Sequence, residues 1–248
     1  MSDVSHFLSV AKTISRKAGD FLVGGAKEIR CIDSQEHHDI KLRADKMSEA
    51  IILEGLREAG GLPVLSEEAG LVGGSRSGFH WIVDPLDGTI NYSRSIPLCC
   101  VSIGLWDGDA PVCGVVYDPY RQEMFSGIAR EGAWLNEQAV RVSNVESKDQ
   151  GILVSGFPAH ADLSEESLRV FIDSVRSYRK LRWLGSAALS LAYVACGRAD
   201  VYEEKNIMLW DIAGAAPILL GAGGSFRLDK TKKEFCLNVS AGNGLIKF

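Results

Sequence analysis

The chain has 248 residues, of which 27 are Lys or Arg and 32 are Asp or Glu, so its formal net charge is −5. Hydrophobic residues make up 46% of the sequence and charged residues 24%, which is typical of a globular protein and excludes a disordered one. The length suits one large domain or two small ones. A net acidic chain without a cluster of Lys and Arg argues against nucleic acid as its main partner.

No apolar run reaches the roughly 18–20 residues that a membrane helix needs. The first twenty residues lack a charged region followed by an apolar core and a cleavage site, so no secretion signal is expected. The cysteines follow neither the spacing of zinc ligands nor that of a disulfide framework, and we expect a cytoplasmic protein with reduced thiols. The six are Cys31, Cys99, Cys100, Cys113, Cys196 and Cys236.

The first half of the chain reads as two helices followed by a sheet. Apolar residues at helical spacing predict a helix over residues 4–23 and another over 44–59, and the segment 32–39 is expected to be an exposed loop. The second helix is expected to turn one face, with Met47, Ala50, Ile51 and Glu54, toward the protein. Short apolar segments predict strands at 62–65, 80–83, 99–106, 112–117 and 123–129. This succession predicts an antiparallel sheet with helices on one face.

After about residue 145, strands and helices alternate, as they do in an α/β layer. The expected strands are 151–155, 181–184 and 199–202, and the expected helices are 163–178, 186–195 and 212–220. Asp162 and Glu165 have the spacing of a capping box at the start of the first of these helices. A glycine-rich turn at 221–224 precedes the last strands. We expect residues 1–144 to be an α+β half and 145–248 an α/β half of one compact unit.

The segment 81–92, WIVDPLDGTINY, carries the strongest chemical signal. An apolar strand is followed by Asp84 and Asp87 with the Leu86 carbonyl between them, and such oxygens are the ligands that Mg²⁺ prefers. Gly88 lets the backbone approach a ligand, and free amides at the start of a following helix attract an anion. The segment therefore predicts a site for a metal and a phosphate. An Asp-rich turn at the end of a strand is the structural alternative.

Two further acidic features stand elsewhere in the chain. Glu67 and Glu68 directly follow a short apolar strand, and Asp211 lies at the start of an apolar helix. Each also has an ordinary explanation, because loop acids are solvated and Asp is a common N-cap residue. They contribute to a site only if the fold brings them to Asp84 and Asp87.

The string DPLDGT at 84–89, preceded by WIV and joined by Trp210-Asp211, resembles the two signature motifs of the inositol monophosphatase family. Other short motifs also resemble sequences of that family: Glu67-Glu68, 185–188 (GSAA), 197–200 (GRAD) and 223–224 (GG). The resemblance therefore runs from Asp39 to Asn243. It implies a magnesium-dependent, lithium-sensitive phosphomonoesterase that forms a homodimer. The implied fold, of the α+β or α/β class, is a layered αβαβα sandwich with an antiparallel sheet in its first half and a mixed sheet in its second.

The resemblance also implies ligands for two or three Mg²⁺ ions. One ion would be held by Glu67, Asp84 and the Leu86 carbonyl. A second would be held by Asp84, Asp87 and Asp211, and a third, looser one by Glu67 with water molecules. Paired metals suit this reaction, because they neutralise the phosphate, activate water and stabilise the leaving alkoxide.

The remaining implied roles concern the phosphate and the attacking water. Gly88 and Thr89 would offer backbone N–H groups to the phosphate. Thr89, oriented by Asp45, would help Glu67 and the first metal to activate the water. Many relatives have a Thr in the stretch leading to the Asp45 position, where this chain has Leu42, so one supporting hydrogen bond is expected to differ. The short C-terminus is expected to alter the outer sheet edge.

The inositol hydroxyls would face Asp87, Glu204 and the backbone of Ser186 and Ala187. A carboxylate accepts two hydrogen bonds from vicinal hydroxyls, so Glu204 favours a polyol substrate. Its structural alternative is a surface acid in the charged triplet at 203–205. The five histidines are expected to have surface or structural roles: His6, His37, His38, His80 and His160.

Several alternatives of the same superfamily remain open. Members acting on adenosine bisphosphates and histidinol phosphate tend to have Lys after the Asp-Gly-Thr step, whereas this chain reads INY at 90–92. The segment is therefore closer to the inositol and broad-specificity bacterial types. Fructose-1,6-bisphosphatase, nucleotide 3′-phosphatase and histidinol-phosphate phosphatase are the enzymatic alternatives. A silent metal-binding regulatory protein is the alternative without activity, and a phosphotransferase is disfavoured because no GxxxxGK loop is present.

Overall fold

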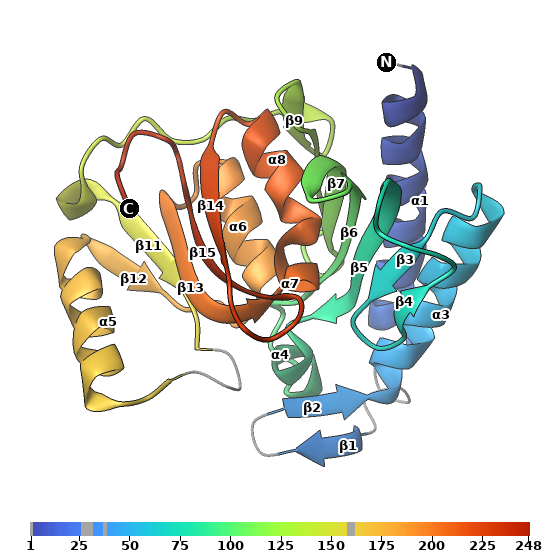
Figure 1. Cartoon of the computed structure of the whole chain (residues 1–248), viewed down its shortest axis with the longest axis horizontal. Helices are drawn as coiled ribbons and strands as arrows, with labels where there is room; N and C mark the ends of the chain where they lie inside the picture. Colours follow the sequence, from blue (N-terminus) through green and yellow to red (C-terminus); the bar gives the residue numbers. More distant parts are fainter. Residues whose placement is uncertain (1, 26–31, 37–38, 158–161) are drawn as a thin grey trace.

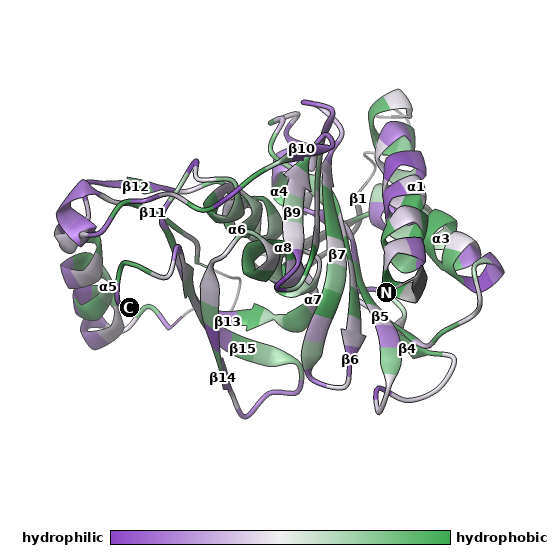
Figure 2. Ribbon diagram, turned by 90° about the horizontal axis from the view of Figure 1, so that it is seen from above, coloured by the Kyte–Doolittle hydropathy of each residue, from purple (hydrophilic) through white to green (hydrophobic). Residues whose placement is uncertain are grey.

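The computed structural model describes residues 2–25, 32–36, 39–157 and 162–248. Its elements stack in five layers, two of them sheets, with helices outside and between the sheets (Figure 1). The helices are α1 (Ser2–Gly24) and α3 (Arg43–Glu58) in the first layer, α6 (Ala187–Ala195), α7 (Leu209–Ala213) and α8 (Ala215–Gly221) in the middle layer, and α5 (Glu165–Ser177) in the last. Seen from above, α1 and α3 lie at one end of the stack and α5 at the other (Figure 2). The αβαβα sandwich is therefore confirmed.

The larger sheet has eight strands in the order β10-β9-β8-β7-β6-β5-β3-β4. In chain order they are β3 (Val64–Ser66), β4 (Gly70–Val72), β5 (Phe79–Asp87), β6 (Cys100–Asp107), β7 (Ala110–Asp118), β8 (Glu123–Ile128), β9 (Gly132–Leu135) and β10 (Gln138–Ala139). Neighbouring strands are antiparallel except β3 and β5, which run parallel.

Helices cover both faces of this sheet, and the two helices of the first half lie on one face, as predicted. α1 and α3 pack on one face, and α7 and α8 pack on the other. The central strands accordingly lack the alternation of a half-solvated sheet, and seven of the eight residues of β6 are buried. Continuous apolar runs of this kind indicate burial but do not say what covers each face.

The smaller sheet has the order β12-β11-β13-β15-β14. Its strands are β11 (Ile152–Ser155), β12 (Lys180–Arg182), β13 (Val201–Met208), β14 (Ser225–Lys230) and β15 (Cys236–Gly242). β11 is parallel to β12 and β13, whereas β15 is antiparallel to β13 and β14. The sheet is mixed, as predicted. A short 3₁₀ helix, η1 (Lys148–Gln150), leads into it.

The described residues of the polar segment 32–39 form strands and not the expected loop, and residues 37 and 38 lie outside the described part of the chain. Strands β1 (Ile32–Glu36) and β2 (Asp39–Leu42) form an antiparallel ribbon with Gln35 opposite Ile40. The ribbon stands beside α4 (Thr89–Ser93) at the edge of the molecule (Figure 1). A hairpin satisfies its backbone hydrogen bonds locally, so a polar composition does not exclude strands.

Helix α3 spans the expected residues but buries a different face. Its buried side chains are Ala44, Asp45, Ser48, Glu49, Ile52 and Leu56. Met47, expected on the inner face, is 39% exposed. The expectation was wrong because three of the buried residues are polar, and a search for apolar periodicity passes over them.

Two expected helices in the second half have different boundaries. Gly214 divides the helix expected over 212–220 into α7 and α8, and a Cβ there would lie 2.5 Å from Ser102 Oγ. α5 begins with Ser164 as its N-cap, whose hydroxyl accepts the Ser167 N–H at 3.4 Å, so the expected Asp162–Glu165 capping box is wrong. Asp162 instead accepts the Ser164 N–H at 2.9 Å.

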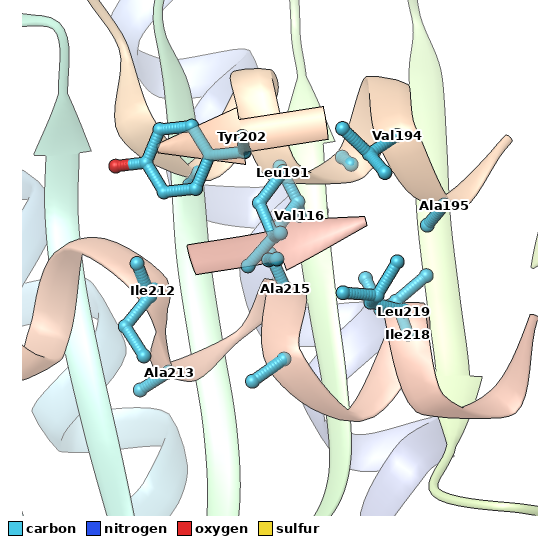
Figure 3. Close-up of a cluster of buried hydrophobic side chains, with 14 of the residues drawn as sticks. Val116, Leu191, Val194, Ala195, Tyr202, Ile212, Ala213, Ala215, Ile218 and Leu219 are labelled. Atoms are coloured by element: carbon cyan, nitrogen blue, oxygen red, sulfur yellow. The ribbon is translucent and has the colours of Figure 1, made fainter. Parts of the chain in front are cut away.

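Three clusters of buried apolar side chains among the described residues hold the layers together. The first lies between α1, α3 and the larger sheet, and the second lies between the two sheets around α6, α7 and α8 (Figure 3). The third is small and contains Leu153 and Val201 of the smaller sheet with Tyr178 and Ile246. Within the described residues, no helix is long and apolar enough to cross a membrane.

Cysteines and histidines have the structural roles expected of them where they are described. Among the described cysteines none forms a disulfide; Cys99, Cys100, Cys113 and Cys236 are buried, and Cys196 is half-buried. His80 is buried between Arg76 and the Gly78 carbonyl, whereas His6 is exposed. Cys31, His37, His38 and His160 lie outside the described residues.

Candidate active site

A bulge at the end of β5 brings Asp84 and Asp87 to one side of the sheet. Residues three apart on a regular strand point to opposite faces. Here the register shifts, because Asp84 pairs with Ser102 but Asp87 pairs with Cys100. The extra residue forms a β-bulge, which accommodates Pro85 because proline has no N–H for the ladder. The charge of Asp87 accordingly raises the pKa of Asp84.

The parallel pairing of β3 with β5 brings Glu67 to Asp84. Ser66 pairs with Val83, and the Glu67 N–H donates to the Val83 carbonyl at 3.3 Å. The carboxyl ends of parallel strands meet at the same edge of a sheet, so the residues that follow, Glu67 and Asp84, become neighbours. The charge of Glu67 is the largest electrostatic contribution, after burial, to the raised pKa of Asp84.

Asp211 reaches the same place from the middle layer of helices. It stands in the first turn of α7, where it accepts the Met208 N–H at 2.8 Å, so it caps the helix from its third position and not as the N-cap residue. Burial and the charges of Glu67 and Asp87 raise the pKa of Asp211. Glu67, Asp84, Asp87 and Asp211, here called the acidic cluster, therefore come from three separate segments and interact electrostatically.

The acidic cluster fits a hard divalent cation. Its donors are carboxylate oxygens with the Leu86 carbonyl close by, and burial followed by mutual repulsion raises the pKa of Asp84. A bound cation offsets both the cost of burying the carboxylates and the repulsion between them. Among the residues that the structure describes, no three His, Cys, Asp or Glu side chains form a cage able to hold an ion by themselves. Mg²⁺ does not need one, since it commonly binds one or two carboxylates and completes its shell with water and substrate phosphate.

The carboxylate of Asp87 lies against the beginning of α6. Ser186 Oγ donates to it at 2.5 Å, and the backbone N–H groups of Ala188 and Ala187 donate at 2.7 and 3.3 Å. Cys100 Sγ donates at 3.6 Å. Burial raises the pKa of Asp87, and the bonds from Ser186 and the two amides oppose that rise. Ser186 and Ala187, expected at the substrate, thus also orient Asp87.

Gly88 and Thr89 begin the short helix α4. Gly88 has φ 89° and ψ 37°, and a Cβ on it would lie 2.7 Å from the Leu98 carbonyl oxygen, so glycine is required there. Thr89 Oγ1 lies 3.1 Å from Asp45 Oδ1 and 3.0 Å from the Leu86 carbonyl oxygen, to either of which it can donate. The first amides of a helix have no acceptor within it.

Asp45 is 2% exposed and is held from both sides. Burial raises its pKa to about 6, while hydrogen bonds from the Leu42 N–H and the Thr89 hydroxyl oppose the rise. The Leu42 bond, at 2.8 Å, comes from the backbone, so a leucine side chain at this position leaves it intact.

Glu204 is not a surface acid. Tyr202 Oη donates to its Oε2 at 2.9 Å, and a Cβ on Gly156 would lie 2.6 Å from its Oε1. Burial raises the pKa of Glu204 to about 7, with a smaller contribution from the charge of Asp87. Glu204 also raises the pKa of Asp211, so it lies beside the acidic cluster. The structural alternative for Glu204 is therefore wrong.

Tyr202 and Asn91 contribute to the site although the sequence did not single out their roles. Tyr202 stands two positions before Glu204 on β13, and residues at that spacing share a face, so strand periodicity could have identified it. Asn91 Nδ2 donates to the carbonyls of Leu98 and Leu184, both at 2.8 Å. It thereby ties the segment after Asp87 to the segment before α6.

The motif GRAD at 197–200 is structural. Arg198 forms a bidentate pair with Glu123, with N–O distances of 2.5 and 2.6 Å. Asp200 accepts the Ile152 N–H at 2.6 Å and the Ser143 hydroxyl. These bonds join the smaller sheet to the larger one and to the chain that connects them.

Known proteins resemble this chain in both sequence and fold. A sequence model of the inositol monophosphatase family matches residues 3–244. The chain is 38% identical over 226 residues to an inositol-1-monophosphatase of Synechocystis sp., with 90% of this chain and 79% of that one covered. It is 37% identical over 242 residues to a Nus factor SuhB of Xylella fastidiosa, with 92% and 87% covered. The inositol monophosphatase structure from Anabaena (Nostoc) sp. superposes with a TM-score of 0.86 at 34% identity, covering 98% and 92%. The chain therefore belongs to the inositol monophosphatase family and is a phosphoric monoester hydrolase.

Proposed function

We propose that this chain hydrolyses a polyol phosphate, most directly myo-inositol monophosphate, with Mg²⁺ bound to its acidic cluster. The observation that carries the proposal is the meeting of four carboxylates from the turn after β3, from β5 and from α7 beside Glu204. Lithium inhibition and a homodimer, which the family resemblance implies, belong to the same proposal.

The metal ligands would come from the ends of the three elements. Glu67, Asp84 and the Leu86 carbonyl would hold one ion, and Asp84, Asp87 and Asp211 a second. Glu67 with water would hold a third. When bound, Mg²⁺ neutralises the phosphate dianion, lowers the pKa of the attacking water and stabilises the leaving alkoxide.

Thr89 and Asp45 would handle the proton of the attacking water. While the Thr89 hydroxyl donates to Asp45 at 3.1 Å, its lone pairs can accept a hydrogen bond from water. Asp45, with a pKa of about 6, is mostly ionised near neutral pH and can receive a proton through Thr89. Gly88 and Thr89 would direct their backbone N–H groups at the phosphate oxygens.

Glu204 supports a polyol as the leaving group. Its Oε2 is held by Tyr202, and its carboxylate can still accept hydrogen bonds from two adjacent hydroxyls. Asp87, whose charge acts on Glu204, accepts hydrogen bonds from the Ser186 hydroxyl and the Ala187 N–H. The vicinal hydroxyls of a sugar or inositol ring would meet hydrogen-bond acceptors here.

The test is a side-by-side assay of phosphate release with and without Mg²⁺. The substrates are inositol 1-phosphate, fructose 1,6-bisphosphate, adenosine 3′,5′-bisphosphate and histidinol phosphate. We expect magnesium-dependent release, with the highest kcat/KM for inositol 1-phosphate. Higher kcat/KM for one of the other three would replace the substrate but keep the reaction. Metal binding without release from any monoester would identify a silent binding protein and overturn the proposal.

A further inference from the structure

Helix α3 carries a buried carboxylate, Glu49, that contacts the turn presenting Glu67. The Ser66 hydroxyl donates to Glu49 Oε1, and the Ala69 N–H donates to the same oxygen at 2.9 Å. These two donors stand on either side of Glu67 in the sequence. One oxygen of Glu49 therefore closes the turn from both ends.

Two neighbouring residues on the same face of α3 bind other segments of the site. Asp45 accepts the Thr89 hydroxyl, and Ser48 Oγ donates to the Pro85 carbonyl at 2.7 Å. Positions three and four apart lie on one side of a helix, so Asp45, Ser48 and Glu49 form a single polar edge. This edge contacts Pro85 within β5, Thr89 at the start of α4, and the turn after β3.

The burial of Glu49 indicates that these bonds matter. Glu49 is 8% exposed and Ser66 is fully buried. Burying a carboxylate is costly unless it is hydrogen-bonded, and the bonds of Glu49 are made to the turn that bears Glu67. A leucine or methionine would fill this inner position of α3 at no such cost. Glu49 instead supplies a hydrogen-bond acceptor to the backbone of the turn.

We propose that Glu49 is a positioning residue, which fixes the turn between Ser66 and Ala69 and thereby sets where Glu67 stands for Mg²⁺ binding. The inference rests on the proposed function, because it assigns Glu67 to the metal. Residues that orient metal ligands typically change metal affinity by about 10–100-fold when removed.

The experiment compares four full-length proteins by calorimetric titration with Mg²⁺ after treatment with EDTA. Glu49→Ala removes the acceptor, and Glu49→Gln keeps an oxygen that can accept both bonds. Ile52→Val is a matched control, because Ile52 is a fully buried residue of α3 that faces the apolar core. Hydrogen exchange of the Ala69 amide is measured in the same proteins.

We expect Glu49→Ala to weaken Mg²⁺ binding at least about tenfold and to speed exchange of the Ala69 amide, while Glu49→Gln and Ile52→Val stay within about threefold of the parent protein. An equal loss of Mg²⁺ affinity in Glu49→Gln and Glu49→Ala would mean that the negative charge of Glu49, and not its hydrogen-bond acceptor, determines the affinity. This result would overturn the inference. Unchanged affinity and exchange in Glu49→Ala would also overturn it. Failure of the parent protein to bind Mg²⁺ would instead refute the proposed function.

Discussion

The Tyr202 hydroxyl donates to the Glu204 carboxylate at 2.9 Å, while the ring of Tyr202 is fully buried in the core between the two sheets. Figure 3 shows the hydroxyl oxygen at the edge of that apolar cluster, pointing away from Leu191 and Val194. A single side chain thus joins the packing of the core to an acid of the candidate active site. The position of Glu204 is set by core packing as well as by its own strand.

Glu204 gives the stability of the protein a defined pH dependence. Its pKa is about 7 in the folded protein, against an ordinary value of 4.5. The folded state therefore holds a proton that the unfolded state has lost, and stability falls as pH rises from about 4.5 through 7. We expect the free energy of unfolding of Glu204→Gln, measured relative to that of the parent protein, to increase by about 2–3 kcal/mol from pH 5 to pH 8. Urea denaturation in EDTA at both pH values measures this.

The contrasting variant is Tyr202→Phe. It removes the hydrogen bond that opposes the rise in the pKa of Glu204, so the loss of stability with rising pH should become larger. A difference between Glu204→Gln and the parent that does not change with pH would contradict the prediction.

Gly156→Ala should alter substrate binding without unfolding the protein. The new Cβ would lie 2.6 Å from Glu204 Oε1 and 2.8 Å from Oε2, so the carboxylate must move. Because that contact is the end of a flexible side chain, we expect a stability change of less than about 1 kcal/mol. KM for inositol 1-phosphate should rise about tenfold, which corresponds to one lost hydrogen bond. Gly78→Ala, which meets nothing within 4 Å, is the matched control for steady-state kinetics.

Gly88→Ala should be destabilising as well as inactivating. Alanine pays about 1–2 kcal/mol in the left-handed conformation, and its Cβ would stand 2.7 Å from the Leu98 carbonyl oxygen. The alanine methyl group would therefore clash with the protein backbone at Leu98, in addition to any clash with the phosphate. Gly108→Ala separates the two effects, because Gly108 has φ 57° with nothing within 4 Å. Thermal unfolding should rank Gly88→Ala well below Gly108→Ala, and equal values would show that the contact relaxes freely.

Asp87→Asn should abolish magnesium-dependent turnover, by more than about 100-fold, because a metal ligand and a negative charge are both lost. Mg²⁺ at about 100 times its Kd should stabilise the parent protein by about 2.7 kcal/mol and the variant much less. Exposed Asp107→Asn serves as the control for charge. Near-normal phosphate release by Asp87→Asn would remove this residue from the site.

Some features of the fold can be predicted from the sequence, whereas others cannot. Helix α1 and the long strands follow from apolar periodicity, whereas the mixed character of the smaller sheet was implied by the family resemblance. The bulge at Pro85 does not, since spacing alone places Asp84 and Asp87 on opposite faces of a strand. The parallel pairing that carries Glu67 to Asp84 depends on which strands become neighbours in space. Local pattern contains no information about either.

The polar contacts of the site were the hardest to foresee. Glu49 and Ser48 occupy the buried face of α3, but their neighbours Met47 and Ala50 match an apolar pattern better, so the helix was oriented wrongly. The hydrogen bond of Ser186 to Asp87 spans 99 positions in the chain. Such pairings follow from tertiary packing, which periodicity does not encode.

That long separation bears on how the protein matures during synthesis. Asp87 leaves the ribosome early, but its hydroxyl and amide donors at 186–188 follow about a hundred residues later. A nascent chain that has completed the larger sheet still lacks the groups that orient this carboxylate. Catalytic competence should therefore arise late, in one step with docking of the C-terminal helices, and a fragment ending before Ser186 should be inert however well it folds.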